Sequence, residues 1–287
     1  MPAVSVLMNC FNGAEFLSEA IESVYAQGFG DWEIVFWDNQ STDDSARIAQ
    51  SYDGRVRYFY APSHTSLGAA RNLALEKACG EYIAFLDCDD VWLPEKLERQ
   101  IALFERDPQL ILVYSDSYFV DGNGVITGTL FKKRRPFAGQ VYPQLLCNDF
   151  IPLLTAVVRR EPISQSGGFC SDFHHAEDWD LFLRLSLLGP FDFVPGCLAK
   201  YRIHANSFHL RNWVLMTCEE IDLLERNTPS IRSLAAEERK QVRRKMLSLH
   251  AKLATKRFVK EGALSSARGV RTSVSRYLDF ARQTESR

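Results

Sequence analysis

The sequence predicts an α/β protein with a doubly wound, mostly parallel sheet and a helical C-terminal extension. Short apolar runs of strand length alternate with amphipathic helical segments through the first 90 or so residues, a pattern typical of parallel strands joined by crossover helices. Polar and acidic residues follow these runs directly, where the carboxyl ends of parallel strands bind ligands in open α/β sheets. With 287 residues, 46% of them hydrophobic, the chain can bury a large core.

Four strands and three helices are expected in the first part of the chain. The expected strands are Val4–Met8, Glu33–Trp37, Val56–Tyr60 and Tyr82–Leu86. The helices between them are expected at residues 14–27, 43–52 and 67–79. Ser41 or Thr42 is a suitable N-cap for the second helix, because a hydroxyl oxygen can accept a hydrogen bond from the first turn.

The rest of the chain has a less regular pattern. Its expected elements are a helix from Pro94 to about 107, a strand at 111–118 with a hairpin turn at 121–124, a helix within 140–150, a strand at 154–159, a helix at 179–189, and helices at 235–259 and 264–281. The segment FKKRRPFAGQ (131–140) contains four consecutive cations. It is either an exposed loop or a lid that attracts an anionic or lipid-linked acceptor.

Charge and cysteine usage bear on partners and location. Residues 231–287 hold 15 Lys and Arg against 5 Asp and Glu, although the net charge is only −2. This basic segment is either a solvated helical face or a contact for an anionic membrane surface or an acidic partner. Seven scattered cysteines without a C-x-x-C pair favour a reducing compartment. We therefore expect a cytoplasmic protein, without a nucleic-acid partner, that is soluble or peripheral to the inner face of the membrane.

The stretch YIAFLDCDDVWLP (82–94) ends an apolar run in three acids, Asp87, Asp89 and Asp90. Carboxylates at i and i+2 after a strand suit a ribose or a hard cation such as Mg²⁺ or Mn²⁺, with diphosphate and water completing the metal shell. The acids could instead interact only with the dipole of the helix that begins near Pro94. Because no glycine-rich phosphate-binding loop follows the first strand, a bound diphosphate would need a metal to offset its charge.

Six stretches together resemble family-2 glycosyltransferases, inverting enzymes of the GT-A fold that use nucleotide sugars. They are VSVLMNCFN (4–12), FGDWEIVFWDNQSTDDS (29–45), SLGAARNLALEKACGEYIAFLDCDDVWLP (66–94), GGF (167–169), HAEDWDLFLRL (175–185) and YRIHANS (201–207). The resemblance implies a GT-A type mixed sheet in which residues 1–110 bind the nucleotide sugar and residues 111–210 bind the acceptor. Residues 211–287 form a basic helical extension outside the family core.

The resemblance also implies a metal and diphosphate site. Asp89 takes the place of the metal ligand and Asp87 lies near the ribose in the D-x-D motif. Arg71 matches the family's basic residue near the nucleotide diphosphate, and the alternative is an arginine on the helix surface. His204 matches the histidine that approaches the metal or diphosphate, and the alternative is a histidine with only local contacts in a loop.

The nucleotide base is expected near the first two loops. The resemblance places Asp38 in the nucleotide pocket and Phe11 against the base, and Asn12 comes from the same loop as Phe11. The family often reads D-D-G-S-T-D where this chain has Asn39 as the second residue. An amide can accept from the N3–H of uracil or thymine and donate to O4. The donor is therefore expected to be a UDP or dTDP sugar.

Asp178, in the HAED stretch, is either a helix N-cap or, as the resemblance implies, the general base. The neighbouring Glu177 and Asp180 would raise its pKa and the helix dipole would lower it. As a base it would deprotonate the hydroxyl of a saccharide or lipid-linked saccharide acceptor during a single displacement. The alternative functions are a sugar-phosphate nucleotidyltransferase and a nucleotide-sugar-binding module without catalytic activity.

Overall fold

The computed structural model describes residues 1–132, 134–204, 212–261 and 274–285. The chain forms two compact units. The first contains Met1–Tyr142 and Asp149–Ala205, and the second contains Pro143–Asn148 and Asn206–Arg287.

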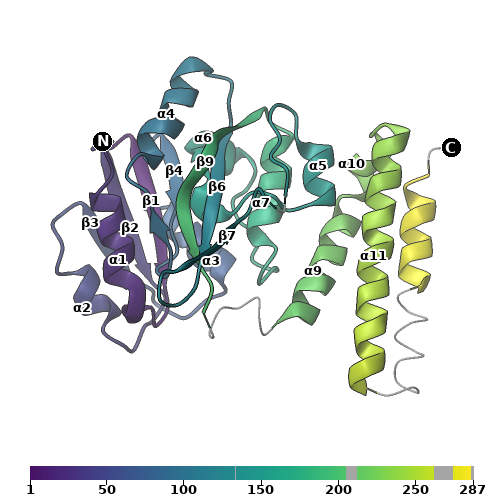
Figure 1. Ribbon diagram of the computed structural model, residues 1–287, viewed down its shortest axis with the longest axis horizontal. Coiled ribbons are helices and arrows are strands. Elements are labelled where there is room, and N and C mark those ends of the chain that lie inside the picture. Colours follow the sequence, from purple (N-terminus) through teal and green to yellow (C-terminus); the bar gives the residue numbers. More distant parts are fainter. Residues whose placement is uncertain (133, 205–211, 262–273, 286–287) are drawn as a thin grey trace. The chain divides into compact units, whose positions relative to one another are not determined.

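The N-terminal half of the sheet in the first unit is parallel. Its strands, the purple and blue arrows in Figure 1, are β1 (Val4–Cys10), β2 (Trp32–Asp38), β3 (Val56–Tyr60) and β4 (Tyr82–Phe85). Strand β1 pairs with β2 and β4, and β2 pairs with β3, all in parallel. The connecting helices are α1 (Ala14–Tyr25), α2 (Ser45–Ala49) and α3 (Leu67–Leu75). The four predicted strands are confirmed, with ends that differ by at most two residues.

The other half of the sheet is mixed. Its elements are β5 (Val91–Trp92), α4 (Lys96–Arg106), β6 (Leu112–Val120), β7 (Ile126–Thr129), α5 (Tyr142–Cys147), η1 (Leu153–Thr155), β8 (Val157–Arg159), α6 (Arg160–Gln165), α7 (Glu177–Ser186) and β9 (Phe191–Arg202). The described strands follow the order β3-β2-β1-β4-β8-β6-β9-β5, with β7 paired to β6. The long β6–β9 pairing is parallel, whereas β8 is antiparallel to both β4 and β6. The predicted α/β fold with a mixed, mostly parallel sheet is confirmed.

The second unit is helical. It contains most of α5 together with α9 (Trp213–Arg226), α10 (Thr228–Arg232), α11 (Ala236–Glu261) and a helix at 274–283. Buried side chains in this unit include Ile221, Leu224, Val242, Met246 and Leu249. The predicted helix at 235–259 is confirmed, and residues 264–273 of the last predicted helix lie outside the described residues. No helix in the described part of the chain is both long enough and apolar enough to cross a membrane.

Three local features differ from the sequence prediction. The strand expected at 154–159 is confirmed only at Val157–Arg159, because Leu153–Thr155 form a turn of 3-10 helix. Strand β9 is not predicted, because Pro195-Gly196 has the composition of a turn. The structure accommodates this pair in a bulge, where the register against β6 shifts and Gly196 has a φ of +95°. The N-cap prediction for α2 is wrong, because the helix follows Asp44 and has no side-chain cap. Ser41 instead accepts a hydrogen bond from the Asn12 N–H, at 3.0 Å.

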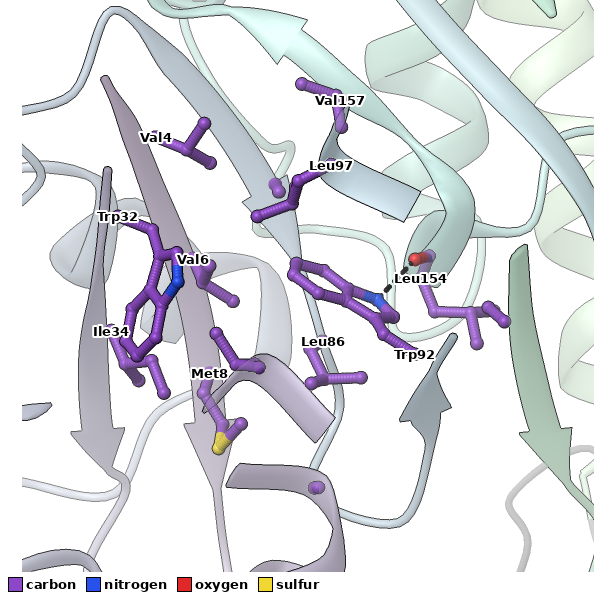
Figure 2. Close-up of a cluster of buried hydrophobic side chains, with 14 of the residues drawn as sticks. Val4, Val6, Met8, Trp32, Ile34, Leu86, Trp92, Leu97, Leu154 and Val157 are labelled. Carbon is purple, nitrogen blue, oxygen red and sulfur yellow. Dashed lines mark hydrogen bonds between the residues drawn. The ribbon is translucent and has the colours of Figure 1, made fainter. Parts of the chain in front are cut away.

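One apolar core lies on one face of the parallel strands. Alternate residues of β1, including Val4, Val6 and Met8, belong to an apolar cluster that also contains Leu97 of α4. Trp92 is buried in the same cluster, and its indole N–H donates to the Leu154 carbonyl oxygen at 2.9 Å (Figure 2). This bond satisfies the polar atom that a buried tryptophan carries. It also ties the turn after the acidic triplet to the chain before β8.

Lys96 is a charged residue in this core. Its side chain is completely buried, and its Nζ has no hydrogen-bond partner among the described residues. The Nζ lies 4.1 Å from the centre of the Trp92 ring, whose face is its main polar compensation. Burial lowers the pKa of the Lys96 amine well below its ordinary value. The folded state therefore binds this proton less tightly than the unfolded chain does.

We predict that Lys96→Met raises the free energy of unfolding at pH 7 by about 1–3 kcal/mol, because it removes a buried polar group without a partner. In the wild type, stability should rise with pH between the lowered folded pKa and the unfolded lysine pKa of ~10.4, and the variant should lose this slope. Urea unfolding at pH 7 and pH 9 measures both effects. Exposed Lys77→Met is the control, and a Lys96→Met protein that is no more stable than wild type would contradict the prediction.

Candidate active site

The loops after three neighbouring strands meet at one edge of the sheet. The Asn39 N–H donates to the Cys10 carbonyl oxygen at 2.8 Å, and the Leu86 N–H donates to the Leu7 carbonyl oxygen at 3.1 Å. These bonds extend the strand pairing to the points where β1, β2 and β4 end. The loops that contain Phe11, Asn39 and Asp87 are thus held beside one another by backbone geometry.

Arg71 links the D-x-D loop to the HAED segment. Its Nη1 donates to Glu177 Oε1 at 2.5 Å, and its Nη2 donates to Asp87 Oδ1 at 3.1 Å. The Arg71 side chain is 5% exposed and that of Glu177 4%, whereas that of Asp87 is 40% exposed. Burial alone would lower the Arg71 pKa, but the charges of Asp87, Glu177 and Asp178 raise it above its ordinary value. The guanidinium is therefore a fixed positive charge between two acidic segments.

The next residue of α3, Asn72, positions the loop that leads to HAED. Asn72 Oδ1 accepts from the Phe169 N–H at 2.8 Å, and its Nδ2 donates to the Phe169 carbonyl oxygen at 2.8 Å. Gly168 has a φ of +72°, and a Cβ at this position would lie 2.5 Å from Asn72 Oδ1. The GAARN and GGF stretches therefore fit together only with glycine here. Arg71 and Asn72 together fix the second acidic segment against the sheet edge.

Asp178 lies in the first turn of α7 and is partly buried. It is not the N-cap, because α7 begins at Glu177 after Ala176 and has no side-chain cap. Burial, Glu177 and Asp149 raise the pKa of Asp178 well above its ordinary value, against the opposing effect of Arg71. Asp180, expected to add to this effect, instead forms an ion pair with Arg184 at 2.6 Å. The sequence does not decide between the neighbouring acids, which raise the Asp178 pKa, and the helix dipole, which lowers it. In the structure the pKa of Asp178 is raised.

The end of β9 holds the D-x-D loop from the other side. The Arg202 N–H donates to Asp90 Oδ1 at 2.8 Å, and Arg202 Nε donates to the Asp89 carbonyl oxygen at 2.8 Å. The Arg202 Nη2 also bonds Glu19 of α1, at 2.6 Å. Asp90 is 2% exposed, so this acid supports the loop rather than facing a ligand. Sequence patterns do not indicate the structural role of Arg202.

Asp89 and His204 form the candidate metal pair. His204 Nε2 lies 3.1 Å from Asp89 Oδ2. Burial and the charge of Asp87 raise the pKa of Asp89, and His204 opposes this effect. The described residues contain no group of three or more His, Cys, Asp or Glu side chains placed to hold a metal. The Asp89 carboxylate oxygen suits Mn²⁺ or Mg²⁺ that takes its other ligands from diphosphate and water, whereas the imidazole nitrogen of His204 suits Mn²⁺ better than Mg²⁺.

The polar residues expected at the nucleotide base have partners within the protein. Asp38 is fully buried, with Oδ1 accepting from the Ser41 N–H and Oδ2 from the Tyr58 hydroxyl, both at 2.7 Å. The Asn39 amide donates to the Thr65 carbonyl oxygen at 2.9 Å and accepts from the Thr65 N–H at 3.2 Å. Both side chains therefore shape the loops at this edge.

Phe11 and Asn12 lie in the loop after β1. The Phe11 side chain is 52% exposed and meets the His64 ring edge-on, with ring centres 4.4 Å apart. His64 Nδ1 donates to the Asn39 carbonyl oxygen at 2.8 Å. Asn12 has a φ of 54°, and its Oδ1 accepts from the Thr42 N–H at 2.8 Å. Sequence reasoning does not find His64, because nothing in its local pattern distinguishes it from other loop histidines.

Comparison with solved structures identifies the fold. The fold is similar to that of TarS residues 1–349 from S. aureus, solved in complex with UDP-GlcNAc. The TM-score is 0.73 at 18% identity, covering 97% of this chain and 81% of that one. It is also similar to the mannosyltransferase PcManGT from Pyrobaculum calidifontis, solved in complex with GDP-Man and Mn²⁺. Here the TM-score is 0.62 at 17% identity, covering 99% and 84% of the two chains. The expected GT-A type fold of nucleotide-sugar glycosyltransferases is confirmed.

Sequence comparison then identifies the family. The profile described as glycosyl transferase family 2 matches residues 5–164. The chain is 31% identical over 217 residues to the putative teichuronic acid biosynthesis glycosyltransferase TuaG of Bacillus subtilis, covering 74% of this chain and 83% of the relative. It is 30% identical over 183 residues to the UDP-Glc:alpha-D-GlcNAc-diphosphoundecaprenol beta-1,3-glucosyltransferase WfgD of Escherichia coli, covering 63% and 69%. The chain belongs to glycosyl transferase family 2, and the glycosyltransferase class implied by its motifs is confirmed.

We predict that Arg71→Met destabilises the protein by about 3–5 kcal/mol, because Glu177 then remains buried without its cation. Replacing both residues, as Arg71→Met with Glu177→Met, should recover much of this loss, because no buried charge is then left unpaired. Urea unfolding of the wild type, both single variants and the double variant measures the coupling between the two residues. Additive effects of the two substitutions would show that this contact does not hold the acidic segments together.

Proposed function

We propose that this protein is an inverting glycosyltransferase that transfers a sugar from a UDP or dTDP sugar to an acceptor hydroxyl. The observation that carries this proposal is the buried Arg71 contact with Asp87 and Glu177. It brings the D-x-D loop and the segment containing Asp178 to one edge of the sheet, although the two are about 90 residues apart in sequence. Transfer needs the D-x-D acids, which serve the nucleotide diphosphate, close to a base such as Asp178, which serves the acceptor hydroxyl.

Asp178 is the proposed general base. Its raised pKa makes its carboxylate a stronger proton acceptor than an ordinary aspartate. In the proposed step it removes the proton of the acceptor hydroxyl, the oxygen attacks the anomeric carbon, and the nucleotide diphosphate leaves. One displacement inverts the configuration at that carbon. Glu177 keeps Arg71 in place and raises the Asp178 pKa at the same time.

The D-x-D loop is proposed to bind the leaving group, which is the nucleotide diphosphate. Asp89 and His204 would hold Mn²⁺ or Mg²⁺, which when bound offsets the charge of the nucleotide diphosphate. Asp87 lies beside them and is exposed enough to meet the ribose. Arg71 is almost fully buried and already contacts two carboxylates. We therefore assign it to orienting Asp87 and to offsetting part of the negative charge of the surrounding carboxylates, rather than to direct contact with the phosphates.

The nucleotide base is proposed to lie against Phe11, which is about half exposed. Thr65 uses one donor and one acceptor position of the Asn39 amide. The Thr65 hydroxyl also donates to the same amide oxygen, at 3.3 Å, so Thr65 orients Asn39 and leaves the second amide N–H to donate to O4 of a pyrimidine. Asp38 and Asn12 support this pocket by fixing the loop at Ser41 and Thr42.

The acceptor is proposed to be a saccharide or lipid-linked saccharide, bound by residues 111–210, in the synthesis of a polysaccharide or glycoconjugate. The two relatives support this, since WfgD is named as acting on a diphosphoundecaprenol-linked sugar and TuaG is named for teichuronic acid biosynthesis. The donor is proposed to bind residues 1–110. We assign residues 211–287, with their excess of cations, to a peripheral contact with the inner face of the membrane from the cytoplasm.

A thermal-shift screen of UDP, dTDP and GDP sugars with Mn²⁺ tests the donor assignment. Stabilisation by UDP or dTDP sugars, followed by their slow hydrolysis without acceptor, supports a transferase. Binding without any turnover, even with candidate acceptors, would favour an inactive binding module. Release of pyrophosphate from a nucleoside triphosphate would favour a nucleotidyltransferase, and a preference for GDP sugars would contradict the role given to Asn39.

We predict that Asp178→Asn lowers the rate of transfer or donor hydrolysis by about 10²–10⁴-fold, because the amide cannot accept the proton. Nucleotide binding, measured by the thermal shift with UDP and Mn²⁺, should stay within a few-fold of wild type. Asp172→Asn, at an exposed acid of the preceding loop, serves as the control. Wild-type turnover in Asp178→Asn would remove the base assignment.

We predict that the transfer rate falls as the pH is lowered through the raised Asp178 pKa, because protonation removes the base. Asp149→Asn removes one of the charges that raise this pKa. The acidic limb of the pH profile should therefore move to lower pH in this variant, while the rate at high pH changes little. Glu105→Gln, an exposed charge on α4, should leave the profile unchanged. An acidic limb that stays in place would show that it reports another group.

A further inference from the structure

The segment after β7 carries exposed cations between two fixed ends. At its start, the Phe131 N–H donates to Asp116 Oδ1 at 2.9 Å. Towards its end, the hydroxyl of fully buried Tyr114 accepts from the Phe137 N–H at 2.7 Å and donates to the Phe137 carbonyl oxygen at 2.8 Å. Gly139 then pairs with Phe191, the first residue of β9. Buried groups of β6 thus hold both ends of the segment.

The cations of this segment point to solvent. Lys132, Arg134 and Arg135 are all exposed, whereas the Phe131 ring packs against Tyr114 and Phe193. Among the described residues, the ion pair recorded for these cations joins Arg134 to Asp149, at 3.9 Å and with an Arg134 side chain that is 47% exposed. Such a pair contributes little to stability. These like charges lie within four positions of the sequence and repel one another, so an anion bound between them would be favoured.

Asp149 links one of these cations, Arg134, to the candidate base. It contacts Arg134 on one side, and on the other it is close enough to Asp178 for its charge to act on that carboxyl. The D-x-D loop approaches the base through Arg71 instead. Arg134 and the D-x-D loop are therefore linked to Asp178 through different residues, Asp149 and Arg71. The donor diphosphate has its own proposed site at Asp89 and His204, which leaves the cations for an anion on the acceptor.

We propose that Lys132, Arg134 and Arg135 bind a phosphate or diphosphate group carried by the acceptor and so place its hydroxyl at Asp178. Arginine suits this role because its planar guanidinium can donate two parallel hydrogen bonds to phosphate oxygens. The phosphate belongs either to a diphosphate that joins a saccharide to a lipid or to a phosphate-containing polymer. This inference rests on the proposed function, since it assumes that an acceptor hydroxyl meets Asp178.

The test uses full-length protein with UDP and Mn²⁺ present. The probes are a phenoxyundecyl diphosphate-linked N-acetylglucosamine, the same phenoxyundecyl glycoside without the diphosphate, and a glycerol-phosphate oligomer. The wild type should bind the diphosphate probe, the oligomer or both at least 10-fold more tightly than the neutral glycoside. Arg134→Gln with Arg135→Gln should remove this preference, and Arg134→Lys with Arg135→Lys should retain part of it. The phosphate probe that loses affinity identifies the source of the phosphate.

Exposed Arg106→Gln with Arg160→Gln is the matched control for loss of two charges from the same unit, and it should keep the wild-type preference. An equal loss in this control, or a wild type without preference for phosphate, would overturn the inference. Vesicles of phosphatidylglycerol and phosphatidylcholine complete the set. If the glutamine variant loses only vesicle binding, the segment contacts a membrane surface and the acceptor assignment falls. UDP binding is measured in the same titrations, so its absence would identify a failure of the proposed function instead.

Discussion

The buried guanidinium of Arg71 lies between Asp87 and Glu177, and both acidic segments depend on it for their positions. Removing an arginine from water is costly unless its donors and its charge are matched. Glu177 is almost fully buried, whereas Asp87 is partly exposed to solvent. Loss of the Arg71 cation would therefore leave the Glu177 carboxylate buried without a compensating charge. Because Asn72 beside it fixes the Gly168–Phe169 turn, one turn of α3 sets the spacing between the D-x-D loop and Asp178.

The sequence is informative where local pattern decides structure. Apolar runs predict β1 to β4, and the acids after β4 predict the edge at which a site lies, because the carboxyl ends of parallel strands must share an edge. The long strand β9 is not predictable in this way, since Pro195-Gly196 has turn composition and only pairing with β6 makes it a strand. Asp178 is found from its motif, but its pKa depends on Asp149, nearly 30 residues away in sequence, which no local pattern reveals.

Several side chains expected to contact a ligand also build the loops that would hold it. Asp38 is occupied by Ser41 and Tyr58, and Asn39 is paired with Thr65. Family motifs mark such positions without separating the two roles, because both demand the same residue type. The distinction needs the partner atoms, which come from segments distant in sequence. A residue can then serve recognition only through the hydrogen-bonding positions that its scaffold contacts leave open.

The 106 residues that separate Arg71 from Glu177 have a consequence for biosynthesis. A nascent chain that has emerged only through α4 contains all four parallel strands and Arg71, but not the carboxylate that neutralises its buried side. Contacts of such long sequence separation form late, because closing the intervening loop costs entropy before the contact is gained. During synthesis, the side chains around α3 in the first half of the sheet are therefore expected to stay loosely packed. They become fully ordered only once α7 has been synthesised.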